Sequence, residues 1–499
     1  MNPFFIGISG ESGVGKTTIA EIISLFFSNL DLIIISTDDL HKWERTNIAW
    51  NNITHLNAEA NNLELGDIHL EDISNGKSIY RSVYNHNTGW FNPPLKIDPK
   101  SIIIIEGLHA FYTDISKKLI DLKIFVDTDE DLRTHWKIIR DTEERNYTYH
   151  MVLDAIKNRK SDSNKTRDAQ INDADVIINI FSEQKIKCIG DRNEKINLIF
   201  TFTYNKPVAQ DMFIFINNYI VEMNKFINIS EVIGNNIELC QNNGGNISLK
   251  ISDKYMIIKP SGSNLKDAYR TNCRSIINYE KINLKLNQVI LNDDILDEIL
   301  ISSVTNTKYK KPSMETAFHV ILNKHVIHVH PIYITLLLCL ENSKKIIAEL
   351  FANLSYNYIN YATPGYNLYK EINMADKAKS IYFLENHGLI LTGDDLSEIS
   401  YLLQEINDVA KLYIEQRCDF KIFDSHLCQT IIEKKYLFPD AVIFAEKQEI
   451  LAAHNFMQLY GGKIGNLRYL THNDVDCLFN LSAEIYRKNE NYNTNGRNW

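Results

Sequence analysis

Four of the chain's histidines crowd into one short stretch, FHVILNKHVIHVHPIY, which covers residues 318–333. They are His319, His325, His328 and His330, whereas the whole chain has 15 histidines among 499 residues. Such a cluster could hold a metal ion, relay protons, or form a histidine-rich core strand. The spacing of these histidines, and the residues that accompany them elsewhere in the chain, favour the first use.

The segment HVIHVH alternates as a β-strand does, so we expect His328 and His330 to point to one face, about 7 Å apart along the backbone. Two imidazoles on one face are half of a typical Zn²⁺ site. A third donor, His387, ends an apolar strand in IYFLENHGLILTG, where Gly388 permits a close turn. Glu315 lies on an expected helix before the HVIHVH strand. Three neutral histidines with an open position and a nearby acid are typical of catalytic zinc.

Two of the four clustered histidines fall outside this geometry. We assign His319 and His325 to packing or to the surface. The alternative for the other three is that they are core histidines whose ring nitrogens are satisfied by backbone carbonyls.

The first half of the chain contains a phosphate-binding motif. The segment FFIGISGESGVGKTTIAEIISLFF predicts an apolar strand, a glycine-rich turn and a helix. The turn matches G-x-x-x-x-G-K-[ST] and comprises Gly10, Gly13, Gly15, Lys16, Thr17 and Thr18. Its backbone N–H groups would surround the β-phosphate of ATP, Lys16 would bridge the β- and γ-phosphates, and the Thr17 hydroxyl would bind Mg²⁺. The alternative is a glycine turn that matches by chance.

Acidic residues follow two other apolar runs. Glu106 ends SIIIIE, and Asp38 and Asp39 follow LIIIST. Because ligands of parallel sheets bind beyond the carboxyl ends of the strands, we expect these acids at the nucleotide crevice, with Glu106 on the Mg²⁺ side. The alternative is that they are helix caps or solvated loop residues.

These motifs together resemble the phosphoribulokinase family, within the wider uridine kinase-like group. The resemblance runs from about residue 4 to residue 180, through STDDLHKWER, AEANNLEL, VYNHNTGWFNPP, IIIIEGLHAFY and HWKIIRDTEERN, in that order. The segments EANN and YNH-x-TG favour phosphoribulokinases over true uridine kinases.

The resemblance implies roles for individual residues. Asp38 would take the proton from the sugar C1 hydroxyl, with Lys16 and Asp141 completing the catalytic set. The sugar-phosphate pocket would be lined by His41, Arg45, Tyr84 and His86. Glu106 and Asp141 would organise Mg²⁺ and the transferring phosphoryl group. Its charge would be neutralised by Lys137, Arg140 and Arg145, although the two arginines could instead be solvated helix charges.

In the second half, two small-residue turns lie beside expected strands: Gly244-Gly245-Asn246 and Ser261-Gly262-Ser263. Together they could form a neutral nest for a phosphate without any cation. The alternative is ordinary hairpin chemistry.

The second half resembles the class II aldolase/adducin family, above all its rhamnulose and fuculose 1-phosphate aldolase branch. The resemblance covers about residues 229–413, through QNNGGNISLK, IIKPSGSNL, KPSMETAFH, HVHPIY, YATPGYNL and ENHGLILTGDD. It implies zinc on His328, His330 and His387, and proton transfer by Glu315. It places the substrate phosphate on Gly245, Asn246, Ser261, Gly262 and Ser313. The family also includes epimerases and decarboxylases, and its adducin-like members lack the metal ligands.

The elements that position these residues predict an α/β protein of two domains. We expect a P-loop kinase domain with a mainly parallel sheet over residues 1–222. An aldolase-like domain with a mixed or antiparallel sheet should cover residues 223–485, and a polar tail should cover 486–499. Seven cysteines without a C-x-x-C pair are expected to be buried thiols of a reducing compartment, which favours a cytoplasmic protein.

The expected function is a bifunctional sugar-phosphate enzyme with ATP, Mg²⁺ and Zn²⁺ as cofactors. The first site would phosphorylate O1 of a ketose such as ribulose 5-phosphate. The second would cleave a ketose 1-phosphate to dihydroxyacetone phosphate and an aldehyde, or form it in the reverse direction. The alternatives are a kinase with a non-catalytic assembly or metabolite-binding module, or a second site that acts as an epimerase or decarboxylase.

Expected partners are small sugar phosphates and, by resemblance, further copies of this chain in a homotetramer formed by the second domain. The net charge of −10 argues against nucleic-acid binding. No apolar run approaches the roughly 20 residues that cross a bilayer, so no membrane association is expected.

Overall fold

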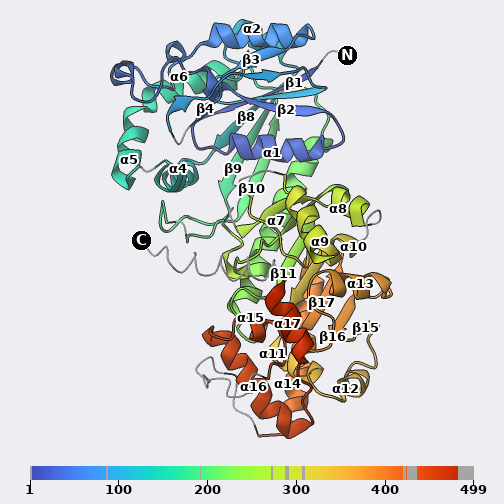
Figure 1. Ribbon diagram of the computed structural model, residues 1–499. Coiled ribbons are helices and arrows are strands. Elements are labelled where there is room, and N and C mark those ends of the chain that lie inside the picture. Colours follow the sequence, from blue (N-terminus) through green and yellow to red (C-terminus); the bar gives the residue numbers. More distant parts are fainter. Residues whose placement is uncertain are drawn as a thin grey trace. The chain divides into compact units, whose positions relative to one another are not determined.

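The computed structural model describes residues 3–85, 88–145, 147–191, 193–270, 273–286, 292–305, 309–419, 423 and 435–481. The chain divides into two units, Met1–Val221 and Glu222–Trp499, each with its own central sheet (Figure 1). The division falls within one helix, α7 (Asp211–Asn235). The predicted tail 486–499 and the expected substrate residue His86 lie outside the described residues.

The first unit is built on a six-stranded sheet in the order β10-β9-β8-β1-β7-β2. Five strands run parallel, and β10 pairs antiparallel with β9 at one edge. The strands are β1 (Phe4–Gly10), β2 (Leu32–Ser36), β7 (Ile102–Glu106), β8 (Leu122–Thr128), β9 (Val176–Ser182) and β10 (Leu198–Tyr204). The prediction of a mainly parallel sheet is confirmed.

Helices cover both faces of this sheet (Figure 1). The helices of the first unit are α1 (Lys16–Phe26), α2 (Leu63–Ser74), α3 (Asp114–Leu119), α4 (Glu130–Glu144), α5 (Tyr149–Asn158), α6 (Lys160–Ile171) and the first part of α7. Ile102 and Ile104 pack in the core that includes α1 and α7, whereas Ile103 and Ile105 pack in the core that includes α2. An apolar residue at every position of β7 is what a strand covered on both faces requires.

Short elements complete the first unit beside the carboxyl ends of β2 and β7. The 3₁₀ turn η1 (Thr37–Leu40) follows β2 directly, and further turns are η2 (Ile48–Asn51) and η3 (Ala58–Ala60). Two small antiparallel pairs are β3 (Ile79–Arg81) with β6 (Leu95–Ile97), and β4 (Tyr84–Asn85) with β5 (Trp90–Phe91).

The second unit has a seven-stranded sheet in the order β13-β12-β11-β14-β17-β16-β15. Every pair is antiparallel except β15 with β16, so the predicted mixed or antiparallel sheet is confirmed. The strands are β11 (Asn246–Lys250), β12 (Tyr255–Ile258), β13 (Ser275–Asn278), β14 (His325–Val329), β15 (Tyr356–Ile359), β16 (Ile381–Leu384) and β17 (Gly388–Gly393).

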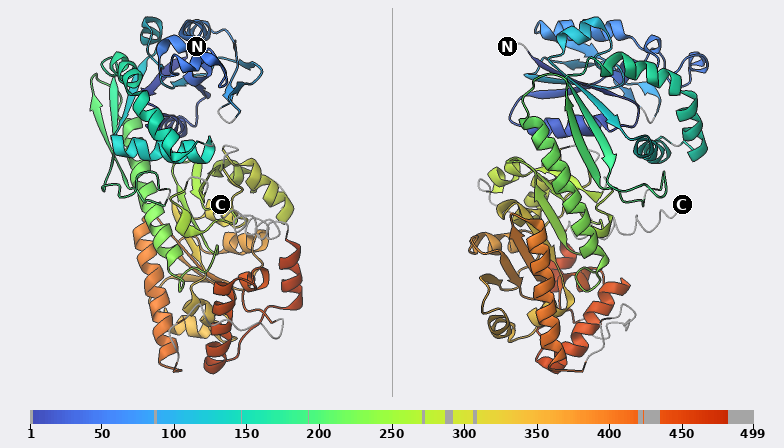
Figure 2. Two further views of the ribbon diagram at one scale, coloured as in Figure 1. Left: turned by 90° about the vertical axis from the view of Figure 1, so that its left-hand side faces the viewer. Right: turned by 180° about the vertical axis from the view of Figure 1, so that it is seen from behind.

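The helices of the second unit lie on both sides of its sheet. They are α8 (Tyr279–Leu286), α9 (Asp293–Ser302), α10 (Thr316–Ile321), α11 (Ile332–Leu338), α12 (Ser343–Leu350), α13 (Tyr366–Met374), α14 (Leu396–Glu415), α15 (Pro439–Ile443), α16 (Gln448–Ile464) and α17 (His472–Asn480), with the turn η4 (Leu265–Asp267). The long helix α14, orange in Figure 2, packs against β14 and β17. Helix α11 contacts both α14 and α16.

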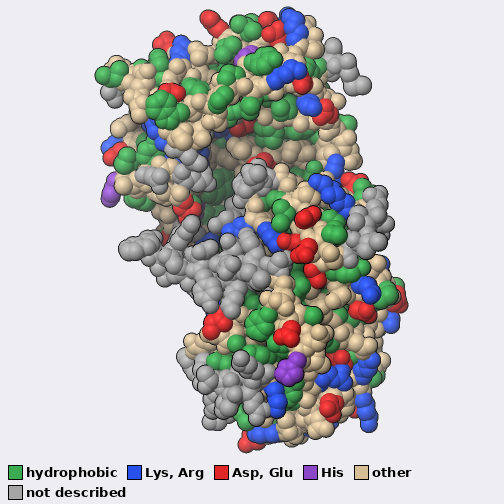
Figure 3. All heavy atoms as spheres, in the orientation of Figure 1, with side chains coloured by type: hydrophobic (Ala, Val, Ile, Leu, Met, Phe, Trp, Pro, Cys, Tyr) green, Lys and Arg blue, Asp and Glu red, His purple; other side chains and the backbone are tan. Residues whose placement is uncertain are grey.

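The surface of the molecule mixes charge types. Acidic and basic side chains are interspersed with hydrophobic ones on the face shown in Figure 3. No helix among the described residues combines the length and the apolar character that a membrane crossing needs. Cys240 and Cys339 are buried, but Cys188 and Cys477 are exposed, so the expectation of buried thiols is wrong for the latter two.

Candidate active sites

The phosphate loop connects β1 to α1 within a strongly curved backbone. Gly10 has φ 151° and Gly13 has φ 91°, values that L-side chains rarely adopt. A Cβ on Gly10 would lie 2.4 Å from the carbonyl oxygen of Val126, so only glycine fits there. Lys16 begins α1 and its Nζ donates to the carbonyl oxygen of Glu11 at 2.7 Å, which folds the side chain back over the loop. Such a loop at a helix N-terminus is suited to bind phosphate groups.

The two predicted acids meet beside this loop. Ser36 of β2 lies opposite Glu106 of β7, and Asp38 follows in η1. Thr17 Oγ1 donates to Glu106 Oε2 at 3.4 Å. Burial, and then the neighbouring Asp38 carboxylate, raise the pKa of the Glu106 carboxyl above its usual range.

Lys16 lies close to Glu106 and Asp38. Burial lowers the pKa of its ammonium, and the charges of Glu106 and Asp38 oppose that effect. Lys16, Asp38 and Glu106 therefore lie together beyond the carboxyl ends of β1, β2 and β7, with Thr17 beside them.

Asp39 has a different role from its neighbour Asp38. One of its carboxylate oxygens accepts from Nε of the buried Arg81 at 3.3 Å, and the other accepts from the backbone N–H of Tyr84 at 2.8 Å. Asp39 thus joins η1 to the strands β3 and β4. Of the two adjacent acids, Asp38 is the candidate base.

A cluster of cations surrounds Asp141 on α4. Its carboxylate contacts Lys137 Nζ at 2.9 Å, Arg140 Nη2 at 2.8 Å and Arg145 Nη1 at 3.4 Å. Burial alone would raise the pKa of the Asp141 carboxyl, but Arg140 and Lys137 hold it below its usual range. Burial, and then the charge of Arg140, lower the pKa of Lys137 to about 8. Lys137 Nζ also lies 3.4 Å from Ser12 Oγ of the phosphate loop, so this cluster adjoins the phosphate site.

Three of the expected sugar-phosphate residues lie together. The His41 ring is 5.1 Å from the Tyr84 ring, and His41 Nδ1 is 2.8 Å from Oδ1 of Asn61. Burial raises the pKa of the Tyr84 hydroxyl, and Arg45 acts in the opposite direction, which places Arg45 beside it. Sequence reasoning missed Asn61, whose only signal is its place in the EANN segment.

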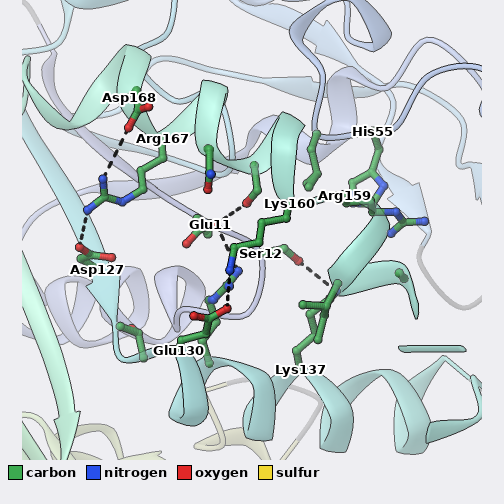
Figure 4. Close-up of a pocket in the computed structure, with 17 residues that line it drawn as sticks. Glu11, Ser12, His55, Asp127, Glu130, Lys137, Arg159, Lys160, Arg167 and Asp168 are labelled. Carbon is green, nitrogen blue, oxygen red and sulfur yellow. Dashed lines mark hydrogen bonds and ion pairs between the residues drawn. The ribbon is translucent and has the colours of Figure 1, made fainter. Parts of the chain in front are cut away.

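A cavity of about 360 Å³ opens between the phosphate loop and α4, α5 and α6 (Figure 4). This volume is typical of small-molecule sites. Its basic lining residues are Arg133, Lys137, Arg159, Lys160 and Arg167. Arg133 pairs with Glu11 of the loop at 3.2 Å, and Arg167 pairs with Asp127 at 2.8 Å. Apart from Lys137, sequence reasoning did not select these cations; for Arg167 the reason is that the family pattern fades after Lys160.

In the second unit, the three predicted metal ligands come together. His328 lies on β14, His330 follows its end, and His387 lies in the turn between β16 and β17. The ligand atoms of the three residues all lie within 4.8 Å of one another, and all three residues are buried. His319 and His325 are outside this cluster. His319 bonds to Ser248 Oγ at 2.8 Å, and His325 Nε2 lies 3.3 Å from a Glu222 oxygen.

The ring nitrogens show why this cluster suits a cation. His328 Nδ1 faces the carbonyl oxygen of Leu389 at 3.1 Å, and His330 Nδ1 faces Asp440 Oδ2 at 3.0 Å. Both partners only accept, so each Nδ1 carries the proton and each neutral ring is left with an acceptor at Nε2. These two Nε2 atoms are nevertheless 3.2 Å apart. Two lone pairs at this distance repel one another unless a metal ion or a shared proton lies between them.

Glu315 completes the cluster from the N-cap position of α10, one residue before the helix on which we expected it. Its Oε1 lies 3.4 Å from His328 Nε2 and 3.5 Å from His387 Nε2. Two ligands of a tetrahedral Zn²⁺ with bonds of 2.0–2.1 Å are about 3.3–3.4 Å apart, and the Nε2 atoms of His328 and His330 lie 3.2 Å apart. Burial lowers the pKa of His387 well below its usual value, which favours the neutral ring that a metal requires.

The predicted phosphate-binding residues adjoin this cluster. Asn246 Nδ2 donates to Glu315 Oε2 at 2.8 Å and to Ser313 Oγ at 3.2 Å. A Cβ on Gly245 (φ 66°) would lie 2.8 Å from the carbonyl oxygen of His328, so this turn lies directly against β14.

A buried lysine joins the two turns of the predicted nest. Lys259 Nζ donates to the carbonyl oxygens of Asn243 and Ser263, both at 2.9 Å, and the residue is 4% exposed. The turn Ser261-Gly262-Ser263 follows Lys259 after one residue, Pro260. The prediction of a nest without any cation is therefore wrong. Lys259 could have been noticed as the one charged residue between the apolar strand and the turn in IIKPSGS.

A parallel sheet with a phosphate loop at its first strand defines the first unit as a P-loop phosphotransferase fold. Residues 5–187 match the Phosphoribulokinase / Uridine kinase family. The chain belongs to this family through its first unit. Residues 226–414 match the Class II Aldolase and Adducin N-terminal domain. Both resemblances expected from the sequence are confirmed.

Individual relatives support the first match. The chain is 34% identical over 182 residues to a phosphoribulokinase of Synechocystis, which covers 36% of this chain and 55% of that protein. It is 35% identical over 164 residues to a uridine kinase of Clostridium perfringens, which covers 31% of this chain and 76% of that protein. The chain thus spans about half the length of the phosphoribulokinases that it matches.

Among solved structures, the second unit is similar to the N-terminal class II aldolase domain of a conserved protein from Thermoplasma acidophilum. The identity is 26%, the match covers 39% of this chain and 93% of that chain, and the TM-score is 0.35.

Proposed function

We propose that the chain is a bifunctional sugar-phosphate enzyme. Its first unit transfers a phosphoryl group from ATP to O1 of a ketose such as ribulose 5-phosphate. Its second unit cleaves a ketose 1-phosphate between C3 and C4, giving dihydroxyacetone phosphate and an aldehyde, or joins them in reverse. The observation that carries this proposal is the convergence of Glu315 and three imidazoles in a chain that also has a phosphoribulokinase-like site.

In the kinase step, Asp38 removes the proton of the O1 hydroxyl as that oxygen bonds to the γ-phosphorus. The bond from this phosphorus to the β,γ-bridging oxygen breaks, and ADP leaves. Lys16, Lys137 and Arg140 supply positive charge where the transition state is anionic. Thr17 and Glu106 would hold Mg²⁺, which would screen the charge of the phosphates.

In the aldol step, His328, His330 and His387 would hold Zn²⁺, which would supply Lewis-acid polarisation of substrate oxygens. The substrate phosphate binds at the turns that contain Asn246 and Ser261, with the charge of Lys259 behind them. As the C3–C4 bond breaks, the C4 hydroxyl loses its proton to water and becomes the aldehyde carbonyl, while the electron pair stays on C3. Glu315 delivers a proton to C3 and recovers one from water. Asn246 holds the other Glu315 oxygen and so fixes the direction of the proton carrier.

The resemblance of the second unit also supports a homotetramer, with the second unit forming the contacts between copies. Closed cyclic symmetry would bury the same surface in every copy. Light scattering of the full-length protein tests this assembly, and a strict monomer with full aldol activity would contradict it.

Two assays on the full-length protein test the proposed activities. ADP release is followed with a panel of ketoses and ketose 5-phosphates, and dihydroxyacetone phosphate release is followed with ketose 1-phosphates. Protein purified without zinc and without aldol activity, but with kinase activity, would favour a non-catalytic second unit. Zinc-dependent formation of an epimer or of CO₂ would favour an epimerase or decarboxylase.

A further inference from the structure

The C-terminal segment of the second unit, residues 435–481, lies beyond the family match at residues 226–414 and yet contacts the histidine cluster. We propose that Asp440 of this segment is a positioning residue of the metal centre, acting through His330. We further propose that residues 435–481 help to hold the metal-binding histidines in place. This inference rests on the proposed function, because it concerns the same metal site.

Asp440 lies on α15 and is 3% exposed. Its Oδ2 is 3.0 Å from His330 Nδ1. The carboxylate holds the ring proton at Nδ1, so the Nε2 lone pair faces His328 and Glu315. Metal-ligating histidines often donate to a carboxylate in this way, which fixes the ring and makes the ligating nitrogen more basic.

The other two rings have different partners. His328 Nδ1 faces only a backbone carbonyl, that of Leu389. His387 Nδ1 is buried and has no hydrogen-bond partner within the part of the chain that the structure describes. Among the described residues, His330 is thus the one ligand with a carboxylate on its outer nitrogen, and Asp440 should make it the strongest donor of the three.

Gly244 packs closely against the Asp440 carboxylate and helps to keep it against the His330 ring. A Cβ on Gly244 would lie 3.0 Å from Asp440 Oδ2 and 3.5 Å from His330 Nδ1. The first phosphate turn therefore packs against the Asp440–His330 contact. A side chain at Gly244 would push the carboxylate away from the ring.

The same segment also holds the turn that carries His387. Asn386 has φ 52°, a left-handed conformation that costs free energy for a residue other than glycine. Its Nδ2 donates to the carbonyl oxygens of Leu437 at 2.8 Å and Arg468 at 2.7 Å. The guanidinium of Arg468 also pairs with Glu385. Residues 435–481 therefore stabilise the backbone that precedes His387 as well as the ring of His330.

The test is the zinc dissociation constant of the full-length protein, measured by competition with a chromophoric chelator. Asp440→Ala should weaken zinc binding by about 10–100-fold, as losses of such outer partners typically do. Asp440→Asn keeps the shape and one acceptor oxygen, so its affinity should fall between those of Asp440→Ala and wild type. Asp440→Glu keeps the carboxylate and should bind more tightly than Asp440→Ala. The matched control is Asp476→Asn, an exposed acid on α17 of the same segment, which should bind zinc as wild type does.

A second readout separates positioning from a general loss of stability. The visible spectrum of the Co²⁺-loaded protein reports ligand geometry, and Asp440→Asn should change it while Asp476→Asn does not. Should Asp440→Ala fail to fold, the zinc affinity and Co²⁺ spectrum of the isosteric Asp440→Asn still test the role of Asp440. Unchanged zinc affinity and Co²⁺ spectrum in Asp440→Asn, with one zinc bound to wild type, would overturn the role of Asp440 alone. A wild-type chain that binds no zinc would overturn the proposed function as well.

Discussion

His328 and His330 place their Nε2 atoms 3.2 Å apart while each outer nitrogen faces a group that can only accept a hydrogen bond. In neutral rings this arrangement directs two lone pairs at one another. Glu315 adds a carboxylate oxygen 3.4 Å from the first of them. The site is therefore arranged for a cation. Substitution of the residues around it should change zinc binding and aldol cleavage in ways that can be measured.

Removal of any one ligand should abolish tight zinc binding. His328→Ala, His330→Ala and His387→Ala each leave two imidazoles, so affinity should fall by at least the roughly 10–100-fold that outer-partner losses cost. Elemental analysis after dialysis measures the zinc that remains. His325→Ala is the control, because this residue lies in the same strand outside the cluster, and it should keep one zinc per chain. Loss of zinc in His325→Ala with retention in His328→Ala would show that the ligands are assigned wrongly.

Glu315→Gln should separate metal binding from carbon–carbon cleavage. The amide keeps the size of the side chain and its contact with Asn246, but it cannot carry a proton. We expect zinc to be retained and cleavage of a ketose 1-phosphate to fall by about 10²–10⁴-fold, the usual contribution of a general acid or base. Cleavage at the wild-type rate would remove Glu315 from the chemistry.

The alternation in HVIHVH, and the apolar run that ends at Gly388, were enough to predict the three histidines, because strand period and turn glycines are local signals. The four isoleucines of β7 likewise predicted a strand buried on both faces. Asp440 could not be found in this way. It lies 110 residues from His330 in the sequence, in a short segment without a motif, and only tertiary packing joins the two.

The position of Glu315 relative to its helix was also predicted incompletely from the sequence. Its proximity to the metal ligands was expected, but its place at the N-cap of α10 was not, since helix boundaries are weakly encoded. The cation Arg133 lies on α4 and Arg159 lies in the turn between α5 and α6, where the sequence resembles ordinary solvated surface. Their common cavity depends on how α4, α5 and α6 pack, which residue spacing does not specify.

In the kinase unit, Lys16→Ala and Asp38→Asn should fail in different ways. Lys16→Ala removes charge that stabilises the transferring phosphoryl group, so turnover and the affinity for ATP should both decrease. Asp38→Asn should bind ATP normally and turn over about 10²–10⁴-fold more slowly, because only the base is lost. Calorimetric ATP titration and ADP release measure the two effects. Near-normal turnover of Asp38→Asn with the preferred ketose would mean that another residue is the base.

The kinase rate should decrease in alkaline solution because of Lys137. Burial and Arg140 lower its pKa to about 8, so it is charged below that pH and neutral above it. The positive charge that it offers to the phosphoryl group is then lost as pH rises, and kcat/KM for the ketose should fall above about pH 8. Lys137→Arg keeps the charge throughout this range and should lack the alkaline decrease. An identical pH profile in both proteins would assign the decrease to another group.

The most direct measurement of the central claim is the release of dihydroxyacetone phosphate from ribulose 5-phosphate, ATP and Mg²⁺ by the zinc-loaded full-length protein. We expect one dihydroxyacetone phosphate and one glycolaldehyde phosphate for each ADP formed. Lys16→Ala should stop this release but still cleave ribulose 1,5-bisphosphate supplied directly, whereas His328→Ala should form ADP and cleave neither. Formation of ADP by wild type without any dihydroxyacetone phosphate, from either substrate or from the ketose 1-phosphate panel, would contradict the proposal of a bifunctional kinase and aldolase.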